Sequence, residues 1–236
     1  MCALFKDLLD PVCYPLSLQR LKKLEKQLKT PATRLALPFI YRGAGHYRKI
    51  APMQAHEEIA ALYQRVRELQ PQMVVEIGTC HGGSLYLWCQ AAAENATIVS
   101  LDLPGGEYGG GYHAAREKLY MNFAQHRQTL HLLRGNSHEE ASKKRVNEIL
   151  KGKGIDFLFI DGDHSYEGVK KDYEMYRPLV RKGGMVALHD TAPRNDSAKI
   201  EVSRFWNEVK AKEERTEEFL NTHANDRTIG IGVVHC

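Results

Sequence analysis

The 236-residue sequence predicts an α/β fold, a Rossmann-like doubly wound sheet with helices on both faces. Short apolar and β-branched runs alternate with amphipathic segments along the chain, which is the pattern of successive βαβ units. Glycine turns or carboxylates follow several of these runs, as at Gly78 and Asp102. In an open parallel sheet such groups meet at one edge, where ligands bind.

The first quarter of the chain differs from the rest. Residues 1–52 are expected to form an N-terminal helical extension, and residues 53–236 the main domain. Leucines recur at helical spacing in Ser17–Lys29, with basic residues between them. We expect a helix that packs on the domain or on a partner subunit, and a basic helix on a membrane surface is the other interpretation. Tyr41–Lys49, broken by glycines, is either a loop over a site or a surface connection.

The main domain is predicted from its apolar runs. Five buried strands are expected at Met73–Ile77, Thr97–Asp102, Leu130–Leu133, Ile155–Ile160 and Met185–Leu188. Amphipathic helices are expected between them, including one over Ala114–Phe123 and one over Glu139–Leu150. The chain is expected to end with a helix that carries Phe205 and Trp206, followed by two terminal strands at Phe219–His223 and Thr228–Val234. The charged tract at Lys210–Glu218 is interpreted as the solvated end of that helix.

Composition argues against nucleic-acid-binding, membrane-spanning and secreted proteins. A net charge of +4 is mild, and no dense basic patch indicates a nucleic-acid partner. No apolar run approaches the roughly 20 residues that cross a bilayer, and the N-terminus lacks the pattern of a signal peptide. The five cysteines are scattered without metal-binding spacing. We therefore expect a reduced, cytoplasmic protein without nucleic-acid or membrane partners, and a homo-oligomer through the N-terminal helices is possible.

The turn after the first strand predicts a cofactor site. Glu76 precedes Gly78, and the sequence continues as Gly78-Thr79-Cys80-His81-Gly82-Gly83-Ser84, which differs from the Gly-x-Gly-x-x-Gly of dinucleotide sites. A carboxylate disfavours a nearby pyrophosphate but tolerates a cationic, zwitterionic ligand such as S-adenosylmethionine. Asp102 would then meet ribose hydroxyls, and Asn136 and Ser137 the adenine. Glu76 as a buried carboxylate with its hydrogen bonds satisfied is the alternative.

The residues that follow the strands at Ile155–Ile160 and Met185–Leu188 indicate the chemistry of the site. Asp161-Gly162-Asp163-His164 follows the first and His189-Asp190 the second. Asp161 and Asp190, ending neighbouring strands, could share a divalent cation, and oxygen ligands favour magnesium. Asp163 is either a helix-start residue or part of the site.

These motifs resemble the class I S-adenosylmethionine-dependent methyltransferases. The resemblance is closest to the metal-dependent small-molecule and sugar O-methyltransferases, many of which carry the name cephalosporin hydroxylase. It rests on the turn at Glu76–Ser84 and on LDLPGGEYGGGY (101–112), LLRGNSH (132–138), FIDGDHSYEGVKKDYEMYRPLVRKGG (159–184) and LHD (188–190). It implies a seven-stranded sheet of order 3-2-1-4-5-7-6 with strand 7 antiparallel.

The resemblance also implies roles for single residues. Asp161, His189 and Asp190 occupy metal positions, although related enzymes have Asp-Asn or Glu-Asp where this chain has His-Asp. His164 matches a general base, a role that suits an imidazole. His189 as a hydrogen-bonding group beside the metal remains open. The full set expected around S-adenosylmethionine is Glu76, Gly78, Thr79, Gly82, Ser84, Asp102, Asn136, Ser137, Asp161 and His164, with Asp161 and His164 also catalytic.

The expected function is a metal-assisted O-methyltransferase that uses S-adenosylmethionine and acts on a hydroxyl of a sugar or other small polar metabolite. Three alternatives remain: a nicotinamide-dependent oxidoreductase, an iron-dependent hydroxylase using two histidines and a carboxylate, and a non-catalytic S-adenosylmethionine-binding module. The sequence does not disclose the acceptor.

Overall fold

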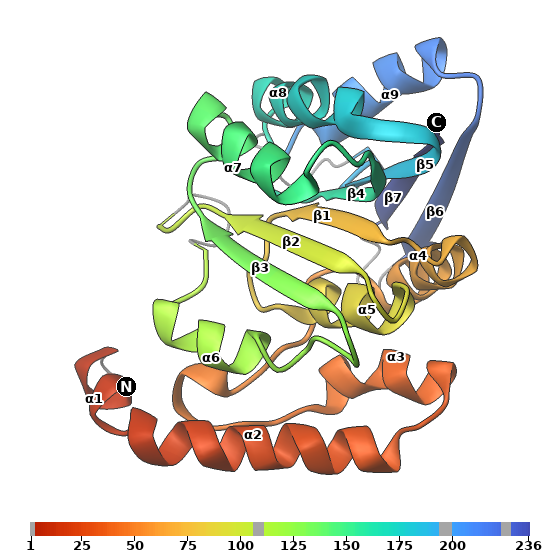
Figure 1. The fold of residues 1–236 in the computed structure, drawn as a ribbon. Coiled ribbons are helices and arrows are strands. Elements are labelled where there is room, and N and C mark those ends of the chain that lie inside the picture. Colours follow the sequence, from red (N-terminus) through yellow and green to blue (C-terminus); the bar gives the residue numbers. More distant parts are fainter. Residues whose placement is uncertain (1–2, 106–110, 194–199, 223–227) are drawn as a thin grey trace.

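A computed structural model of the chain describes residues 3–105, 111–193, 200–222 and 228–236. One seven-stranded sheet lies at its centre, with helices on both faces (Figure 1). The strands are β1 (Met73–Ile77), β2 (Thr97–Asp102), β3 (Thr129–Arg134), β4 (Ile155–Ile160), β5 (Val180–His189), β6 (Thr216–Thr222) and β7 (Thr228–His235). Their order is β3-β2-β1-β4-β5-β7-β6. The strands from β3 to β5 pair in parallel, and β7 is antiparallel to its two neighbours, so the predicted fold is confirmed.

The helices divide between the two faces. On one face lie α4 (His56–Leu69), α5 (Gly83–Ala91) and the short η2 (Ala114–Arg116) and α6 (Glu117–Tyr120); on the other lie α7 (Glu140–Leu150), α8 (Tyr166–Tyr176), η3 (Arg177–Leu179) and α9 (Val202–Lys212). β1 shows why both faces are covered: Val74 belongs to the core under α5, and Val75 to the core under α7 and α8. All five residues of this strand are buried, including Glu76, as is typical of a parallel strand that is covered on both faces.

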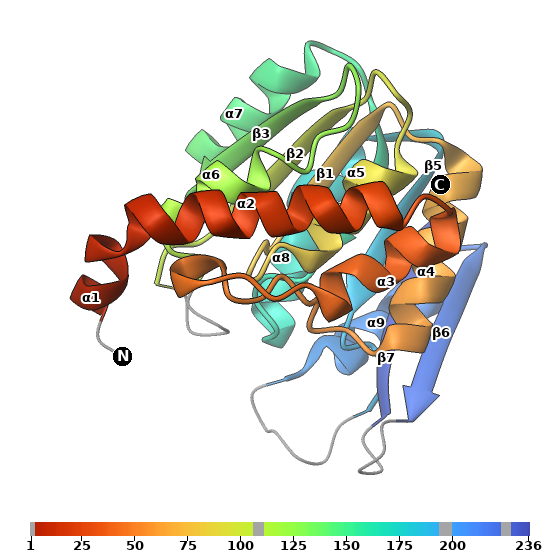
Figure 2. The same cartoon turned by 90° about the horizontal axis from the view of Figure 1, so that it is seen from below.

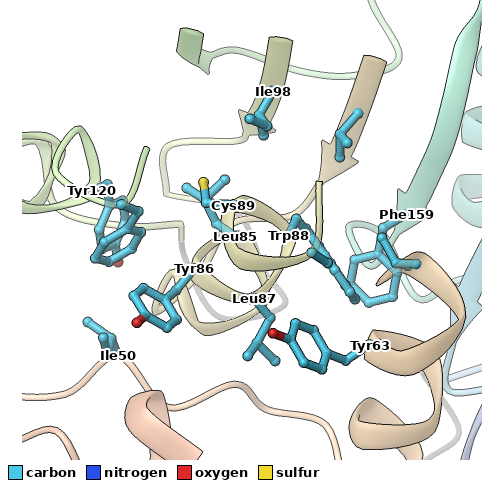
Figure 3. Close-up of a cluster of buried hydrophobic side chains, with 14 of the residues drawn as sticks. Ile50, Tyr63, Leu85, Tyr86, Leu87, Trp88, Cys89, Ile98, Tyr120 and Phe159 are labelled. Atoms are coloured by element: carbon cyan, nitrogen blue, oxygen red, sulfur yellow. The ribbon is translucent and has the colours of Figure 1, made fainter. Parts of the chain in front are cut away.

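The core beneath α5 is rich in aromatic side chains. Trp88 of α5 is fully buried, and its ring lies 5.2 Å from that of Phe159 on β4 in an edge-to-face arrangement (Figure 3). Tyr86, on another side of the same helix, meets Phe123 edge-on at 5.4 Å. Such rings bury large apolar areas and prefer these tilted geometries. The start of α5, which carries the glycine turn, is thereby fixed against the sheet.

The N-terminal residues add an outer layer. α1 (Ala3–Leu8), α2 (Asp10–Gln27), α3 (Pro31–Ile40) and the short η1 (Gly45–Tyr47) lie beyond α5 and α6, and α2 crosses the outside of the molecule (Figures 1 and 2). Leu21 and Cys13 of α2 are buried in the core on that side. No helix in the described part of the chain is both long enough and apolar enough to span a bilayer.

Several element bounds differ from expectation. The helix expected from Ser17 begins at Asp10: Pro11 lies in its first turn, where proline is tolerated, and the helix continues through Pro15. Ala114–Phe123 forms a 3-10 turn and a short helix rather than one long helix. The charged tract at Lys210–Glu218 is not simply a helix end: α9 stops at Lys212, and Thr216 opens β6. Residues from Thr216 form a strand because they pair with β7, and the charge pattern of the sequence does not indicate such pairing.

Candidate active site

A pocket of about 200 Å³ opens at the carboxyl edge of the parallel strands. Its wall is formed by the segments that follow β1 to β4, with polar lining from Asp102, Asn136, Ser137, His138, Asp161 and Asp163. Of the residues predicted to hold a cofactor, the described lining contains Gly78, Asp102, Asn136, Ser137 and Asp161, and does not contain Glu76, Thr79, Gly82, Ser84 or His164. Strand order explains the convergence, since β1 to β4 are neighbours in the sheet.

Gly78 is required by the close approach of two strand ends. Its φ is +93°, and a Cβ there would lie 2.0 Å from the carbonyl oxygen of Asp161. A side chain would therefore collide with backbone that cannot move easily. The turn after β1 and the turn after β4 touch only because this residue is glycine.

Asp102 is anchored by backbone donors. Its Oδ1 accepts from the Thr79 N–H at 3.1 Å and its Oδ2 from the Tyr112 N–H at 2.9 Å. Burial raises the pKa of Asp102, and these N–H groups oppose that shift. The carboxylate thus ties the glycine turn to the end of the Pro104–Tyr112 loop, of which residues 106–110, including Tyr108, lie outside the described residues.

Glu76 lies beneath the glycine turn rather than in the pocket wall. It is fully buried and accepts hydrogen bonds from Trp88 Nε1 at 3.0 Å and from Ser100 Oγ at 2.5 Å. Ser100 Oγ in turn lies 2.6 Å from Thr79 Oγ1. Burial raises the pKa of Glu76 to about 7, although these donors oppose the shift. This placement is that of a satisfied buried carboxylate, the alternative left open by the sequence.

A cluster of acidic and imidazole groups lies at the ends of β4 and β5. Ligand atoms of Asp161, His164 and Asp190 lie within 4.8 Å of one another. His164 Nδ1 is 2.6 Å from Asp190 Oδ2, and His164 Nε2 is 3.8 Å from Asp161 Oδ1. Burial lowers the pKa of His164, but the hydrogen bond with Asp190 and the two negative charges outweigh it, so the pKa lies above its ordinary value. These three side chains could hold a divalent cation.

His189 is held between two carboxylates. Its Nδ1 lies 2.9 Å from Asp161 Oδ1 and its Nε2 lies 3.3 Å from Glu58 Oε1. Burial lowers the pKa of His189, but Asp161 and Asp190 raise it well above the ordinary value. The candidate metal cluster of Asp161, His164 and Asp190 does not include His189. Its predicted role as a metal ligand stays a prediction, and its observed contacts orient Asp161.

The first turn of α4 and the segment just before it supply two site residues that the sequence did not suggest. Gln54 Nε2 donates to Asp161 Oδ2 at 2.6 Å. Glu58 is buried and, besides facing His189, accepts from the Ala55 N–H at 2.6 Å. Both lie more than 100 residues from their partners at the strand ends. The only local signal is a glutamate in the first turn of a helix, which is common at helix starts.

His138 and Asp172 form a second pair beside the pocket. His138 lines it, and its Nε2 lies 3.4 Å from Asp172 Oδ1. Asp172 is fully buried, and within the described ranges neither of its carboxylate oxygens has a hydrogen-bond partner. The Asp172 charge raises the pKa of His138. An acidic residue on the inward face of α8, between Val169 and Met175, is the sequence signal that would have indicated this pair.

Two further pocket residues have plain structural roles. Asp163 Oδ1 accepts from the Ser165 N–H at 2.9 Å and from Ser165 Oγ at 2.7 Å, so it shapes the turn that leads into α8 while lining the pocket. Burial and the neighbouring carboxylates raise the pKa of the Cys80 thiol to about 11. Such a thiol is a poor nucleophile at neutral pH, as expected for a small filler residue.

Part of the main domain is similar to known proteins. Residues 75–191 match a family model described as a methyltransferase domain. Two curated relatives are uncharacterized proteins: one of Sinorhizobium fredii is 29% identical over 152 residues, and one of Acanthamoeba polyphaga mimivirus is 34% identical over 116 residues. These matches span 62% and 49% of this chain. They span only 16% of the first relative and 50% of the second.

Solved structures share the fold. An O-methyltransferase of Bacillus cereus in complex with SAH superposes with a TM-score of 0.60 at 16% identity, over 99% of this chain and 97% of that chain. The O-methyltransferase TomG of Streptomyces achromogenes, involved in tomaymycin synthesis and in complex with SAM, gives 0.58 at 13% identity, over 93% and 89%. Residues 75–191, just under half of the chain, therefore match a methyltransferase domain, and the chain as a whole shares the fold of these solved O-methyltransferases.

Proposed function

We propose that this chain transfers a methyl group from S-adenosylmethionine to a hydroxyl oxygen of a sugar or another small polar metabolite, assisted by a divalent cation, most simply magnesium. The observation that carries the proposal is the cluster of Asp161, His164 and Asp190 beside the pocket, to whose wall Asp161 belongs. The complexes of similar folds with SAM and SAH support the choice of cofactor.

The residues of the cluster suit a hard cation. Asp161 and Asp190 offer carboxylate oxygens, the ligands that magnesium and manganese prefer, and Asp190 is 3% exposed. A cation held by these carboxylates would lower the pKa of a hydroxyl bound to it. Two carboxylates close together also favour a cation, since each raises the electrostatic cost of ionising the other.

His164 is assigned to the proton. An acceptor hydroxyl must lose its proton as the methyl arrives, and an imidazole is suited to take it. Asp190 holds Nδ1 of this ring at 2.6 Å and thereby sets its orientation. Nε2, on the side of Asp161, is the atom assigned to receive the proton.

The cofactor half of the pocket supplies position. Asp102 is assigned to the ribose hydroxyls, and Asn136 and Ser137 to the adenine, because all three line the pocket at the ends of β2 and β3. Glu76 is assigned to the support of the turn, through Trp88 and Ser100.

Calorimetry and turnover test the proposal in sequence. We expect S-adenosylmethionine to bind to the full chain at micromolar to millimolar concentration, and absence of binding at millimolar ligand would sink the proposal. A panel of hydroxylated acceptors, scored by release of S-adenosylhomocysteine, then tests transfer. Turnover that a chelator leaves unchanged would remove Asp161 and Asp190 from a metal role.

Two histidine variants separate ligand from base. We expect His164→Ala to lose turnover while manganese affinity changes little, if His164 is the base. A loss of manganese affinity in His164→Ala assigns it to the metal instead. The same measurement on His189→Ala tests the ligand role that the resemblance implies for His189. Cofactor binding without transfer to any acceptor would favour a non-catalytic module, and hydroxylation dependent on iron would favour the oxygenase alternative.

A further inference from the structure

The N-terminal extension and the main domain carry opposite charge. Residues 1–52 contain ten Lys and Arg against three Asp and Glu, a formal charge of +7, whereas the whole chain carries +4 and residues 53–236 therefore carry −3. Charge segregation of this kind indicates an electrostatic role for the basic part. The mild net charge of the whole chain conceals it.

The positive charge gathers along a groove on α2. A hollow of about 750 Å³ lies between this helix and residues 42–44, and its lining includes Arg20, Lys22, Lys23, Lys26 and Arg42. Lys22 pairs with Glu25 at 3.2 Å. Within the described part of the chain no carboxylate forms an ion pair with Arg20, Lys23 or Lys26. Three cations are thus held together without local neutralisation, although like charges close together repel.

Exposed apolar side chains lie on the same side of α2 as these basic residues. Val12 and Leu16 are 58% and 55% exposed, and they precede Arg20 and Lys23 at spacings of three to four residues, so that all lie along one side of the helix. Leu8, at the end of α1, is 76% exposed. The inner side of α2 is already covered, since Leu21 is fully buried in the core. The outer side is therefore a surface with an apolar half and a cationic half.

We propose that this outer face of α2 docks the enzyme onto a membrane surface rich in anionic phospholipid. Basic side chains are drawn to the anionic headgroups, and leucine and valine side chains enter the interface between headgroups and acyl chains. A nucleic acid would satisfy the cations but offers no apolar layer to Val12 and Leu16. Figures 1 and 2 show α2 on the outside of the molecule, so a flat surface can approach it without displacing another element.

Co-sedimentation of the full chain with vesicles tests the proposal. We expect binding to vesicles of phosphatidylcholine with about one third phosphatidylserine, and little binding to phosphatidylcholine alone. Binding should weaken when salt rises from about 0.1 M to about 1 M, because the screening length falls from about 10 Å to about 3 Å. The variant Arg20→Glu, Lys23→Glu, Lys26→Glu should bind at least roughly 100-fold more weakly, since each basic residue near such a surface contributes about fivefold.

A matched control places the same charge change elsewhere. Lys144, Lys151 and Lys153, all exposed, lie at and after α7, on the other side of the molecule from α2 (Figure 1). Changing these three to Glu should leave vesicle binding within about threefold of wild type, because side chains beyond a screening length of about 10 Å contribute little. A second variant, Val12→Ser with Leu16→Ser, should keep the preference for anionic vesicles and lose the fraction bound at high salt.

Three results overturn the proposal. Equal binding to neutral and anionic vesicles, or no binding to either, removes the lipid surface. Equal loss of binding in the α2 and α7 triple variants shows that net charge alone is responsible. A dimer in solution that Leu16→Asp dissolves assigns the face to a second copy of the chain instead. None of these readouts depends on methyl transfer.

Discussion

The carboxylates at the ends of β1 and β2 differ from those at the ends of β4 and β5 in the donors they use. Asp102 accepts from two backbone N–H groups, and Glu76 from an indole and a hydroxyl. Asp161 and Asp190 instead face the imidazoles of His189 and His164, and Asp161 also accepts from the Gln54 amide. Neutral donors do not titrate near pH 7, whereas imidazoles do.

This difference separates a fixed half from an exchangeable half. Backbone and indole donors do not exchange, so we expect the half proposed to bind the cofactor to keep one arrangement with and without a ligand. In the β4–β5 half, a divalent cation can replace the positive charge of an imidazolium beside the same oxygens. Substitutions in the fixed half should therefore act on stability and cofactor affinity, and substitutions in the exchangeable half on turnover.

The largest effect is expected from Asp190→Asn. Asparagine keeps the shape and tolerates the positive φ of 58° at this position, but removes a negative charge from the candidate metal cluster. Turnover should fall at least about 100-fold, while cofactor affinity measured by calorimetry changes less than about threefold. Asp156→Asn is the control, because that buried carboxylate holds the N–H groups of Gln72 and Met73 at the other end of the strands. An equal loss of turnover in both variants would contradict the division into a fixed and an exchangeable half.

Glu58→Gln should have the next largest effect. The amide keeps an oxygen near His189 Nε2, at 3.3 Å in the wild type, but removes the negative charge that helps to fix the ring against Asp161. The maximal rate should fall about 10- to 100-fold with cofactor affinity unchanged, as is typical when a partner behind a metal site is altered. Glu68→Gln, exposed on the same helix, is the matched control. Full activity in Glu58→Gln would show that His189 does not act through Asp161.

Asp102→Ala tests the fixed half. The change leaves the N–H groups of Thr79 and Tyr112 without their acceptor, and each buried unpaired group costs about 1–3 kcal/mol. Cofactor affinity should fall roughly tenfold and the melting temperature should fall measurably, while turnover at saturating cofactor changes by less than about threefold. A loss of turnover as large as that of Asp190→Asn would mean that the halves are not separable.

The smallest effect is a pH dependence of stability at Glu76. Burial raises the pKa of Glu76 from 4.5 to about 7, so the folded protein binds a proton more tightly than the unfolded chain. The resulting stabilisation is complete below pH 4.5 and is lost as the pH rises to about 7. Glu76→Gln cannot titrate, so the melting temperature of wild type relative to Glu76→Gln should decline between those pH values. A flat difference would contradict the assignment of a buried, partly protonated carboxylate.

The amino-acid sequence by itself determined the secondary structure and the edge of the sheet at which the candidate site lies. Apolar runs set β1 to β4 close to their observed bounds, whereas β5 and β6 begin at Val180 and Thr216, before the runs that predicted them. The glycine turn at Gly78 and the acidic residues at Asp102, Asp161 and Asp190 marked one edge of the sheet. These are local signals: a strand buried on both faces is rich in apolar side chains, and a turn with a φ of +93°, as at Gly78, favours glycine. The same motifs predicted the methyltransferase class, and residues 75–191 match a methyltransferase-domain family model.

The tertiary structure decided which partner each polar group has. Gln54 reaches Asp161 and Glu58 reaches His189 only because α4 packs on a face of the sheet with its first turn near the ends of β4 and β5. Asp172 meets His138 only because α8 packs beside the segment after β3. Contacts between residues more than 30 positions apart leave no periodic trace in the sequence, since periodicity reports only which face of an element is buried. The placement of Glu76 beneath the turn, and of His189 between two carboxylates, was fixed by packing in the same way.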